Sequence, residues 1–240
     1  MGELEWLGAV RHAESVGNVA ALLAEGSGAQ RLDLAPRDPD VPLSDLGREQ
    51  AAATRGWLAG QPKPDLVLVS PYLRTVDTAK AMTDGLDLRL TCDERLRDRE
   101  LGILDLLTAR GVQELHPTEA ERRQRLGKFY YRPPGGESWA DVALRTRALL
   151  TDLRREHDDR RVLLVTHDVV VQIIRYLVED LDEQRLLDLS RAAAIANTSV
   201  STWARDGDGR LAPQLFNDIA HLQARDTTPT KEEGLRAEPV

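Results

Sequence analysis

The run Arg161-Val162-Leu163-Leu164-Val165-Thr166 indicates the fold class of this chain better than any other segment. It is short and mostly aliphatic, with polar residues at its ends, which is typical of a strand buried on both faces of a sheet. His167 follows it directly, and the apolar segment over 170–178 is predicted to be a helix. A strand that leads through a polar turn into a helix is the building unit of α/β proteins.

Two earlier segments repeat this pattern. Leu4–Val10 is apolar and ends in the charged cluster of residues 11–14, and Asp65–Ser70 precedes Pro71 and a predicted helix over Thr75–Met82. The remaining predicted elements are helices around 19–23, 51–58 and 139–155, a strand at 86–92, and a hairpin of 199–203 and 211–215. Strands that alternate with helices predict an α/β three-layer sandwich with a mostly parallel central sheet and helices on both faces.

The domain organisation is predicted to be simple. We expect a single domain over residues 1–221, interrupted by a partly helical insertion at about 103–137 that covers the face where the strands end. From about Leu222 onward the chain is polar, contains proline and lacks periodicity, so residues 222–240 are predicted to form a disordered tail.

Composition narrows the class of partner. The formal net charge of −8 argues against nucleic acid, although local arginines can still bind a small anion. The single cysteine, Cys92, excludes an internal disulfide framework and a multi-cysteine metal site, and fits a reducing compartment. No apolar run is long enough to cross a bilayer, and no signal peptide is recognisable, so we expect a cytoplasmic protein without a membrane partner.

Polar residues follow the strands and suggest one site. Sites in parallel sheets gather at the carboxyl ends of the strands, which places Arg11-His12, Ser70–Arg74 and Thr166-His167 on one rim. Transfer of a phosphoryl group needs a nucleophile, fixed positive charge and an acid for the leaving oxygen. A neutral His12 suits the first role, and the planar guanidinium groups of Arg11 and Arg74 suit the second.

Three further residues complete the predicted phosphate site. His167 would add a donor to the ring around the phosphate. Ser15 and Asn18 would donate neutral hydrogen bonds to the substrate where the loop turns into the first helix, whose N-terminus favours an anion.

Four segments of the chain resemble one known family. Val10-Arg11-His12-Ala13-Glu14-Ser15-Val16-Gly17-Asn18 is similar to the arginine-histidine-glycine-glutamate signature of the histidine phosphatase superfamily, in its phosphoglycerate mutase-like branch. The other three segments follow in the family's order and spacing, and are Ser70–Thr75, Leu96–Gly102 and Val165–His167. The resemblance spans roughly Val10 to Trp203 and implies a phosphoglycerate mutase-like fold.

The resemblance also implies roles for the site residues. His12 would become phosphorylated, Arg11, Arg74 and His167 would hold the phosphate, and no metal or cofactor would be needed. A carboxylic acid would protonate the leaving group and then activate water. Asp98 aligns with the position where the family usually has glutamate, and Asp168 and Glu100 rank behind it as alternatives. Ala13 stands where glycine is usual, a small change unless the backbone there needs a positive φ.

The resulting hypothesis is a cofactor-independent phosphatase, a phosphoric monoester hydrolase that acts on a small phosphorylated metabolite. A phosphoglycerate-type mutase would use the same phosphohistidine, and a non-catalytic phosphate-ligand binding protein on this fold is the third alternative. The motifs do not name the substrate, which depends on the insertion at 103–137. They also leave the oligomeric state open, with a homodimer as one option.

Overall fold

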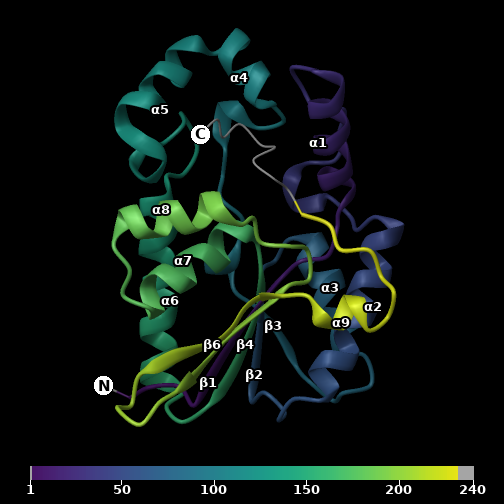
Figure 1. Ribbon diagram of the computed structural model, residues 1–240, viewed down its shortest axis with the longest axis vertical. Helices are drawn as coiled ribbons and strands as arrows, with labels where there is room; N and C mark the ends of the chain where they lie inside the picture. The colour runs from purple at the N-terminus through teal and green to yellow at the C-terminus, as the bar shows by residue number, and fades with distance from the viewer. Residues whose placement is uncertain (1, 232–240) are drawn as a thin grey trace.

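The central sheet confirms the predicted fold class. The computed structural model describes residues 2–231, and within them a six-stranded sheet runs in the order β3-β2-β4-β1-β5-β6 (Figure 1). The strands are β1 (Trp6–Arg11), β2 (Leu66–Val69), β3 (Leu90–Cys92), β4 (Arg161–Thr166), β5 (Val200–Arg205) and β6 (Leu211–Asp218). The four strands β3, β2, β4 and β1 are parallel, whereas β5 and β6 pair antiparallel along one edge.

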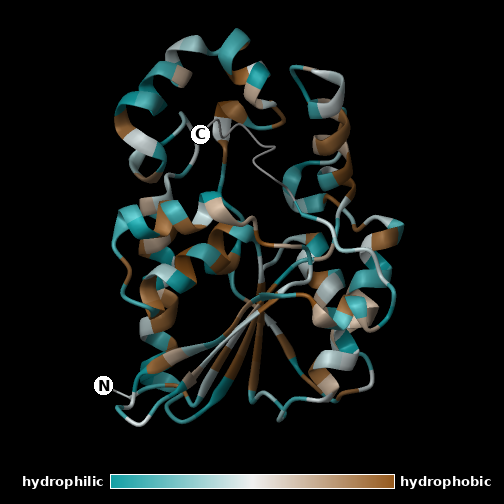
Figure 2. Cartoon of the chain, in the orientation of Figure 1, coloured by the Kyte–Doolittle hydropathy of each residue, from teal (hydrophilic) through white to brown (hydrophobic). Residues whose placement is uncertain are grey.

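Helices cover both faces of this sheet. The helices of the described residues are α1 (Val16–Ser27), α2 (Asp45–Ala59), α3 (Leu73–Thr83), α4 (Ala109–Leu115), α5 (Pro117–Tyr130), α6 (Trp139–Glu156), α7 (Asp168–Val178), α8 (Glu183–Ala192) and α9 (Ala220–Gln223). The helices α6, α7 and α8 pack on one face, and α2 and α3 pack on the other. Figure 2 shows hydrophobic residues concentrated on the central parallel strands between these two layers. Within residues 2–231, no helix has both the length and the apolarity to cross a bilayer.

The central position of β4 in the sheet explains why its sequence is apolar at successive positions. Val162 and Leu164 belong to the core on the α6–α7 side, and Leu163 and Val165 belong to the core on the α2–α3 side. Side chains of a strand alternate between the two faces of a sheet, and both faces are covered here. The parallel arrangement then delivers the polar residues after β1, β2 and β4 to the same rim.

The segment over 103–137, which we predict to be an insertion, carries two helices near that rim. The helices α4 and α5 lie beyond the carboxyl ends of the parallel strands, at the same end of the molecule as α1 (Figure 1). They have a core of their own, made by Leu104, Leu107, Val112 and Tyr131. The segment that enters the insertion crosses the segment that leaves it at Gly102, whose φ is 56° and whose Cβ would lie 2.1 Å from the carbonyl oxygen of Pro134. Only glycine fits that crossing.

The C-terminal part of the chain differs from the predicted disorder over 222–240. Leu222 is fully buried in α9, and the segment after α9 is hydrogen-bonded to the body as far as Lys231. Two buried amide side chains, Gln50 and Asn197, supply these bonds. The prediction used only the local composition of the segment, which contains no information on partners so far away in the sequence. Residues 232–240 of the predicted tail lie outside the described part of the chain.

Candidate active site

The register of the sheet brings two histidines together. Arg11 at the end of β1 pairs with Thr166 at the end of β4, and the backbone N–H of His12 donates to the carbonyl oxygen of Thr166 at 2.9 Å. Each strand then continues directly into a histidine, and the rings of His12 and His167 stand edge to face with centroids 5.2 Å apart. Two residues separated by more than 150 positions therefore share one rim, as the sequence predicts.

The tautomer of His12 is set by its own backbone. Its Nδ1 lies 2.7 Å from the carbonyl oxygen of Ala13, which can only accept, so Nδ1 carries the proton and Nε2 carries the lone pair. Burial of the ring lowers its pKa well below the usual value, and the positive charge of Arg74, with smaller contributions from His167 and Arg11, lowers it further. His12 is thus a neutral imidazole with a free lone pair, which is the form a nucleophile requires.

The polar backbone groups around His12 all have hydrogen-bond partners. We call residues 12–14 the nucleophile loop. The N–H of Ala13 donates to Thr78 Oγ1 at 3.0 Å, and the N–H of Glu14 donates to Gln50 Oε1 at 2.9 Å. The carbonyl oxygen of Glu14 accepts from the N–H of Ser44 at 3.0 Å. This loop is rigid because each of its donors and acceptors has a partner in the surrounding elements.

The two predicted arginines are both buried and fixed. The Arg11 side chain is 1% exposed, and its Nη1 donates to the carbonyl oxygen of Ile195. Arg74 lies in the first turn of α3 and is fully buried. Its Nη1 donates to Asp38, at 2.7 Å from the carbonyl oxygen and 3.0 Å from Oδ1, while its Nη2 donates to Asp98 Oδ2 at 3.0 Å. Both guanidinium groups are therefore oriented before a substrate arrives.

His167 and Asp98 form the other side of the site. The Nε2 of His167 lies 2.8 Å from Ser70 Oγ, and its Nδ1 lies 3.3 Å from Asp98 Oδ2. Burial lowers the pKa of His167, and the charge of Asp98 opposes that effect only in part. Asp98 Oδ2 is thus shared between Arg74 and His167, which places a carboxyl group next to two of the predicted phosphate ligands.

The three carboxyl groups considered for the acid occupy different surroundings. Asp98 contacts the predicted site directly. Glu100 is exposed, and its Oε1 accepts from the N–H of Gly102 at 3.2 Å, away from the histidines. Asp168 is the first residue of α7, where a negative charge is favoured by the helix dipole. The geometry therefore favours Asp98 for the acid, and this role stays a prediction.

Ser15 and Asn18 form a capping box at the start of α1. Ser15 Oγ accepts from the backbone N–H of Asn18 at 3.2 Å, and Asn18 Oδ1 accepts from the backbone N–H of Ser15 at 2.8 Å. Ser15 is fully buried, and its hydroxyl also donates to Asn18 Oδ1. The two side chains order the turn after the nucleophile loop, and their role in substrate binding stays a prediction.

Three residues of the site were not singled out from the sequence. Asp38 comes from a loop rich in Gly, Pro and Asp that has no periodicity, so nothing local distinguishes it. Ser70 begins the Ser70–Arg74 segment predicted to lie on the rim, in which only Arg74 has a predicted role. Asn197 is fully buried and donates through Nδ2 to the carbonyl oxygen of His12 at 3.1 Å. Its one signal is a polar run placed directly before a buried strand.

A comparison with known families covers the whole of this site. The family profile described as histidine phosphatase superfamily (branch 1) matches residues 7–218, a range that contains every residue named above as part of the rim. The chain belongs to this superfamily.

Individual proteins similar to this chain have names of two kinds, phosphatase and mutase. A glucosyl-3-phosphoglycerate phosphatase of Mycolicibacterium vanbaalenii is 37% identical over 135 residues, which cover 53% of this chain and 59% of that relative. A probable phosphoglycerate mutase of Yersinia enterocolitica is 29% identical over 218 residues, covering 89% of this chain and 93% of the relative. The solved structure of a mycobacterial glucosyl-3-phosphoglycerate phosphatase with VO3 has a TM-score of 0.69 at 26% identity, with 90% of this chain and 100% of that chain covered.

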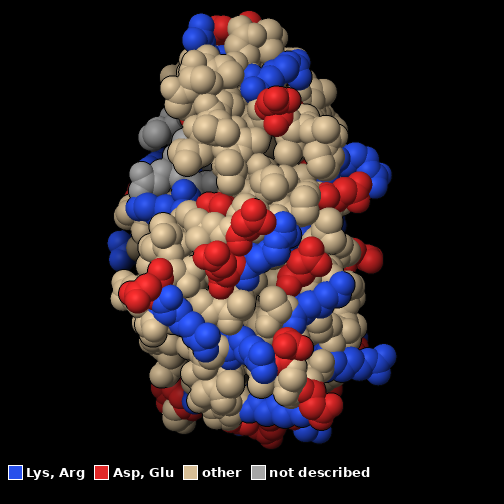
Figure 3. Space-filling view, turned by 90° about the vertical axis from the view of Figure 1, so that its right-hand side faces the viewer, with Lys and Arg blue, Asp and Glu red and all other residues tan. Residues whose placement is uncertain are grey.

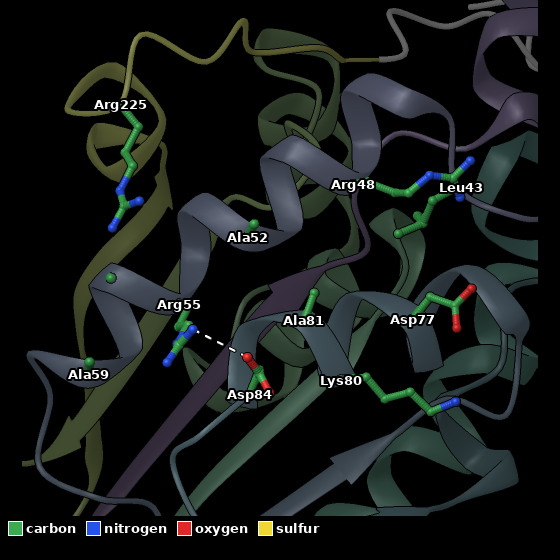
Figure 4. Close-up of a pocket in the computed structure, with 11 residues that line it drawn as sticks. Leu43, Arg48, Ala52, Arg55, Ala59, Asp77, Lys80, Ala81, Asp84 and Arg225 are labelled. Carbon is green, nitrogen blue, oxygen red and sulfur yellow. Dashed lines mark hydrogen bonds and ion pairs between the residues drawn. The ribbon is translucent and has the colours of Figure 1, made fainter.

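A hollow of this histidine phosphatase is lined by none of the predicted site residues. It has a volume of about 770 Å³ and lies between α2 and α3, where an ion pair of 3.3 Å joins Arg55 to Asp84 (Figure 4). Figure 3 shows the side of the molecule that carries α2 with acidic and basic side chains interspersed. Such a surface produces no strong field of one sign.

Proposed function

We propose that this protein hydrolyses a small phosphomonoester through a phosphohistidine formed on His12. One observation carries the proposal: a buried, neutral His12, whose Nδ1–H is bound to Ala13, lies beside His167 and within the field of two buried arginines. Relatives that are named as phosphatases support the assignment of this chain as a phosphoric monoester hydrolase.

The first step transfers the phosphoryl group to the enzyme. Nε2 of His12 attacks phosphorus, and the bond from phosphorus to the leaving oxygen breaks. Arg11, Arg74 and His167 surround the three equatorial oxygens, where the charge of the transition state is spread. Asp98, next to Arg74 and His167, gives its proton to the leaving oxygen.

The second step returns the enzyme to its starting form. Asp98, now a carboxylate, takes a proton from water as the water oxygen attacks phosphorus. The bond from phosphorus to Nε2 breaks, and inorganic phosphate leaves. The same carboxyl group serves as acid and then as base, so each turnover restores its proton. All of these roles belong to residues of the chain itself.

The proposed substrate is a small phosphorylated metabolite handled in the cytoplasm. The segment over 103–137 lies at the rim with a small hydrophobic cluster of its own (Figure 1), so it is the part of the chain that we expect to select the substrate. The single cysteine fits a reducing compartment. The phosphatase relative supports a phosphorylated sugar acid as the first class to assay, because its name gives glucosyl-3-phosphoglycerate as its substrate.

A mutase is the second candidate, because the Yersinia relative named probable phosphoglycerate mutase covers 89% of this chain. Both reactions pass through the same intermediate and differ in whether water or a bound sugar acid receives the phosphoryl group. The mutase would interconvert 2- and 3-phosphoglycerate faster than it releases phosphate.

A panel of phosphorylated metabolites, assayed for phosphate release, tests the proposal. We expect release from at least one phosphomonoester, and we expect His12→Ala to lower it by a factor of about 10³ or more. His157→Ala is the matched control, because His157 caps the far end of α6, and it should retain the wild-type rate. Wild-type activity in His12→Ala would refute the proposal, and rapid interconversion of the phosphoglycerates with slow release would favour the mutase.

A further inference from the structure

The segment after α9 carries a threonine that bridges two buried amides. The chain turns back past α2 after α9 (Figure 1), and Thr230 Oγ1 then accepts from Gln50 Nε2 at 2.9 Å. The same hydroxyl donates to Asn197 Oδ1 at 3.1 Å. A hydroxyl has one proton to donate, so a single threonine side chain serves one amide as acceptor and the other as donor.

Both amides reach the nucleophile loop with their other ends. Gln50 Oε1 accepts from the backbone N–H of Glu14 at 2.9 Å, and Asn197 Nδ2 donates to the carbonyl oxygen of His12 at 3.1 Å. A backbone N–H can only donate and a carbonyl oxygen can only accept, so these contacts set which amide atom is oxygen and which is nitrogen. The two remaining amide atoms are then an Nε2 donor and an Oδ1 acceptor, which are the groups that the Thr230 hydroxyl joins.

The result is a continuous series of hydrogen bonds from one end of the nucleophile loop to the other. It runs from the N–H of Glu14 through Gln50, Thr230 and Asn197 to the carbonyl oxygen of His12. Gln50 and Asn197 are both fully buried, so each depends on its partners to offset the loss of water. The backbone of Thr230 strengthens the bridge, because its carbonyl oxygen accepts from the N–H of Asn197 at 2.8 Å.

We propose that Thr230 is a positioning residue for the nucleophile, acting on His12 through Gln50 and Asn197. This inference rests on the proposed role of His12. The ring of His12 is oriented by the bond from its Nδ1 to Ala13, the middle residue of the loop that the series holds at both ends. Thr230 lies beyond residues 7–218, the range that the superfamily profile matches.

The test compares three variants in the full-length enzyme. Thr230→Val keeps the shape of the side chain and removes the hydroxyl. We expect it to lower kcat by about 5- to 100-fold with KM changed less than about 3-fold, because it misaligns the attacking nitrogen without removing a phosphate ligand. Thr230→Ser restores the hydroxyl and should restore most of kcat. Thr228→Val is the control, since the Thr228 side chain is exposed and only its carbonyl oxygen binds Gln50.

A spectroscopic readout separates positioning from a general loss of stability. Long-range ¹H–¹⁵N correlation spectra report which imidazole nitrogen of His12 carries the proton. Wild-type protein and Thr230→Ser should show the Nδ1–H form, and Thr230→Val should show a mixture of tautomers while circular dichroism confirms that it is folded. A folded Thr230→Val with wild-type kcat and an unchanged tautomer would overturn the inference, as would an equal loss in Thr228→Val. If His12→Ala keeps its activity, the proposed function fails instead, and the tautomer comparison still decides the role of Thr230.

Discussion

Replacing Asp98 by asparagine tests the assignment of the acid most directly. The asparagine side chain has nearly the same shape, but it neither gives up a proton at neutral pH nor carries a charge. The structure indicates that the fold tolerates this change, because Arg74 keeps Asp38 as a carboxylate partner at 3.0 Å. The effect on activity should therefore report chemistry.

The size of the effect follows from what Asp98 does in each step. Proton transfer by a positioned side chain contributes about 10²- to 10⁴-fold to a rate, equivalent to about 2.7–5.4 kcal/mol of activation free energy. Phosphate esters of simple alcohols need that proton, because an alkoxide is a poor leaving group. A nitrophenyl phosphate does not, so its phosphohistidine should form in Asp98→Asn with a loss of less than about 10-fold.

The assay is a single-turnover measurement of phosphohistidine formation with a series of leaving groups. Asp98→Asn should show a rate that falls steeply as the leaving group becomes more basic, whereas the wild type should show a shallow dependence. Glu100→Gln and Asp168→Asn are the matched controls and should keep the shallow dependence. The reasoning is refuted if Asp98→Asn hydrolyses an alkyl phosphate at the wild-type rate, or if one of the two controls shows the steep dependence instead.

Two further predictions concern stability. Burial above all lowers the pKa of His12, and it also lowers that of His167. As the pH falls below about 6.5, the unfolded chain binds these protons first, so stability is full above that pH and declines below it by about 1.4 kcal/mol per pH unit per histidine. In urea unfolding between about pH 5 and pH 7, the free energy of unfolding of His12→Ala should depend less steeply on pH, by the contribution of one histidine. An unchanged pH dependence would contradict the lowered pKa of His12. Gly47→Ala would place a Cβ 1.9 Å from the carbonyl oxygen of Glu14, so urea unfolding should show a loss of about 1–3 kcal/mol together with a lower kcat. Gly56→Ala on the same helix meets only a flexible side chain, at 3.4 Å, and should leave both unchanged or gain up to about 1 kcal/mol.

The parts of the fold that the sequence predicted well are those set by local physics. The bounds of β4 were predicted as Arg161–Thr166, because a strand buried on both faces must be apolar at successive positions. The gathering of His12 and His167 followed from a general property of parallel sheets, whose carboxyl ends share one rim. The helix α8 was not predicted, although it packs Leu186 into the core, because it is short and polar on its outer face.

The parts that escaped prediction depend on contacts between distant segments. Asp38 binds Arg74 from an irregular loop, and its carboxyl group has no local pattern that marks it. The segment over 222–231 is polar and reads as disordered, yet it is held by Gln50 and Asn197, which lie 178 and 33 positions away from their partners Thr228 and Thr230. Hydrogen bonds of this kind are stabilising only because the amides are buried, and burial is a property of the fold.

The pairing of Arg74 with two carboxylates indicates how substrate binding and proton transfer are coupled. A buried guanidinium needs counter-charges, and Asp38 and Asp98 supply them at 3.0 Å each. Phosphate oxygens that bind Nη2 compete with Asp98 for the same donor, whereas Asp38, on Nη1, keeps the arginine in place. We expect that loss of the contact with Arg74, with a phosphate dianion beside Asp98, would favour the protonated form of its carboxyl group. In the proposed mechanism, phosphate binding would thus promote protonation of Asp98, the proposed acid, while the contact with Asp38 would hold Arg74 in place.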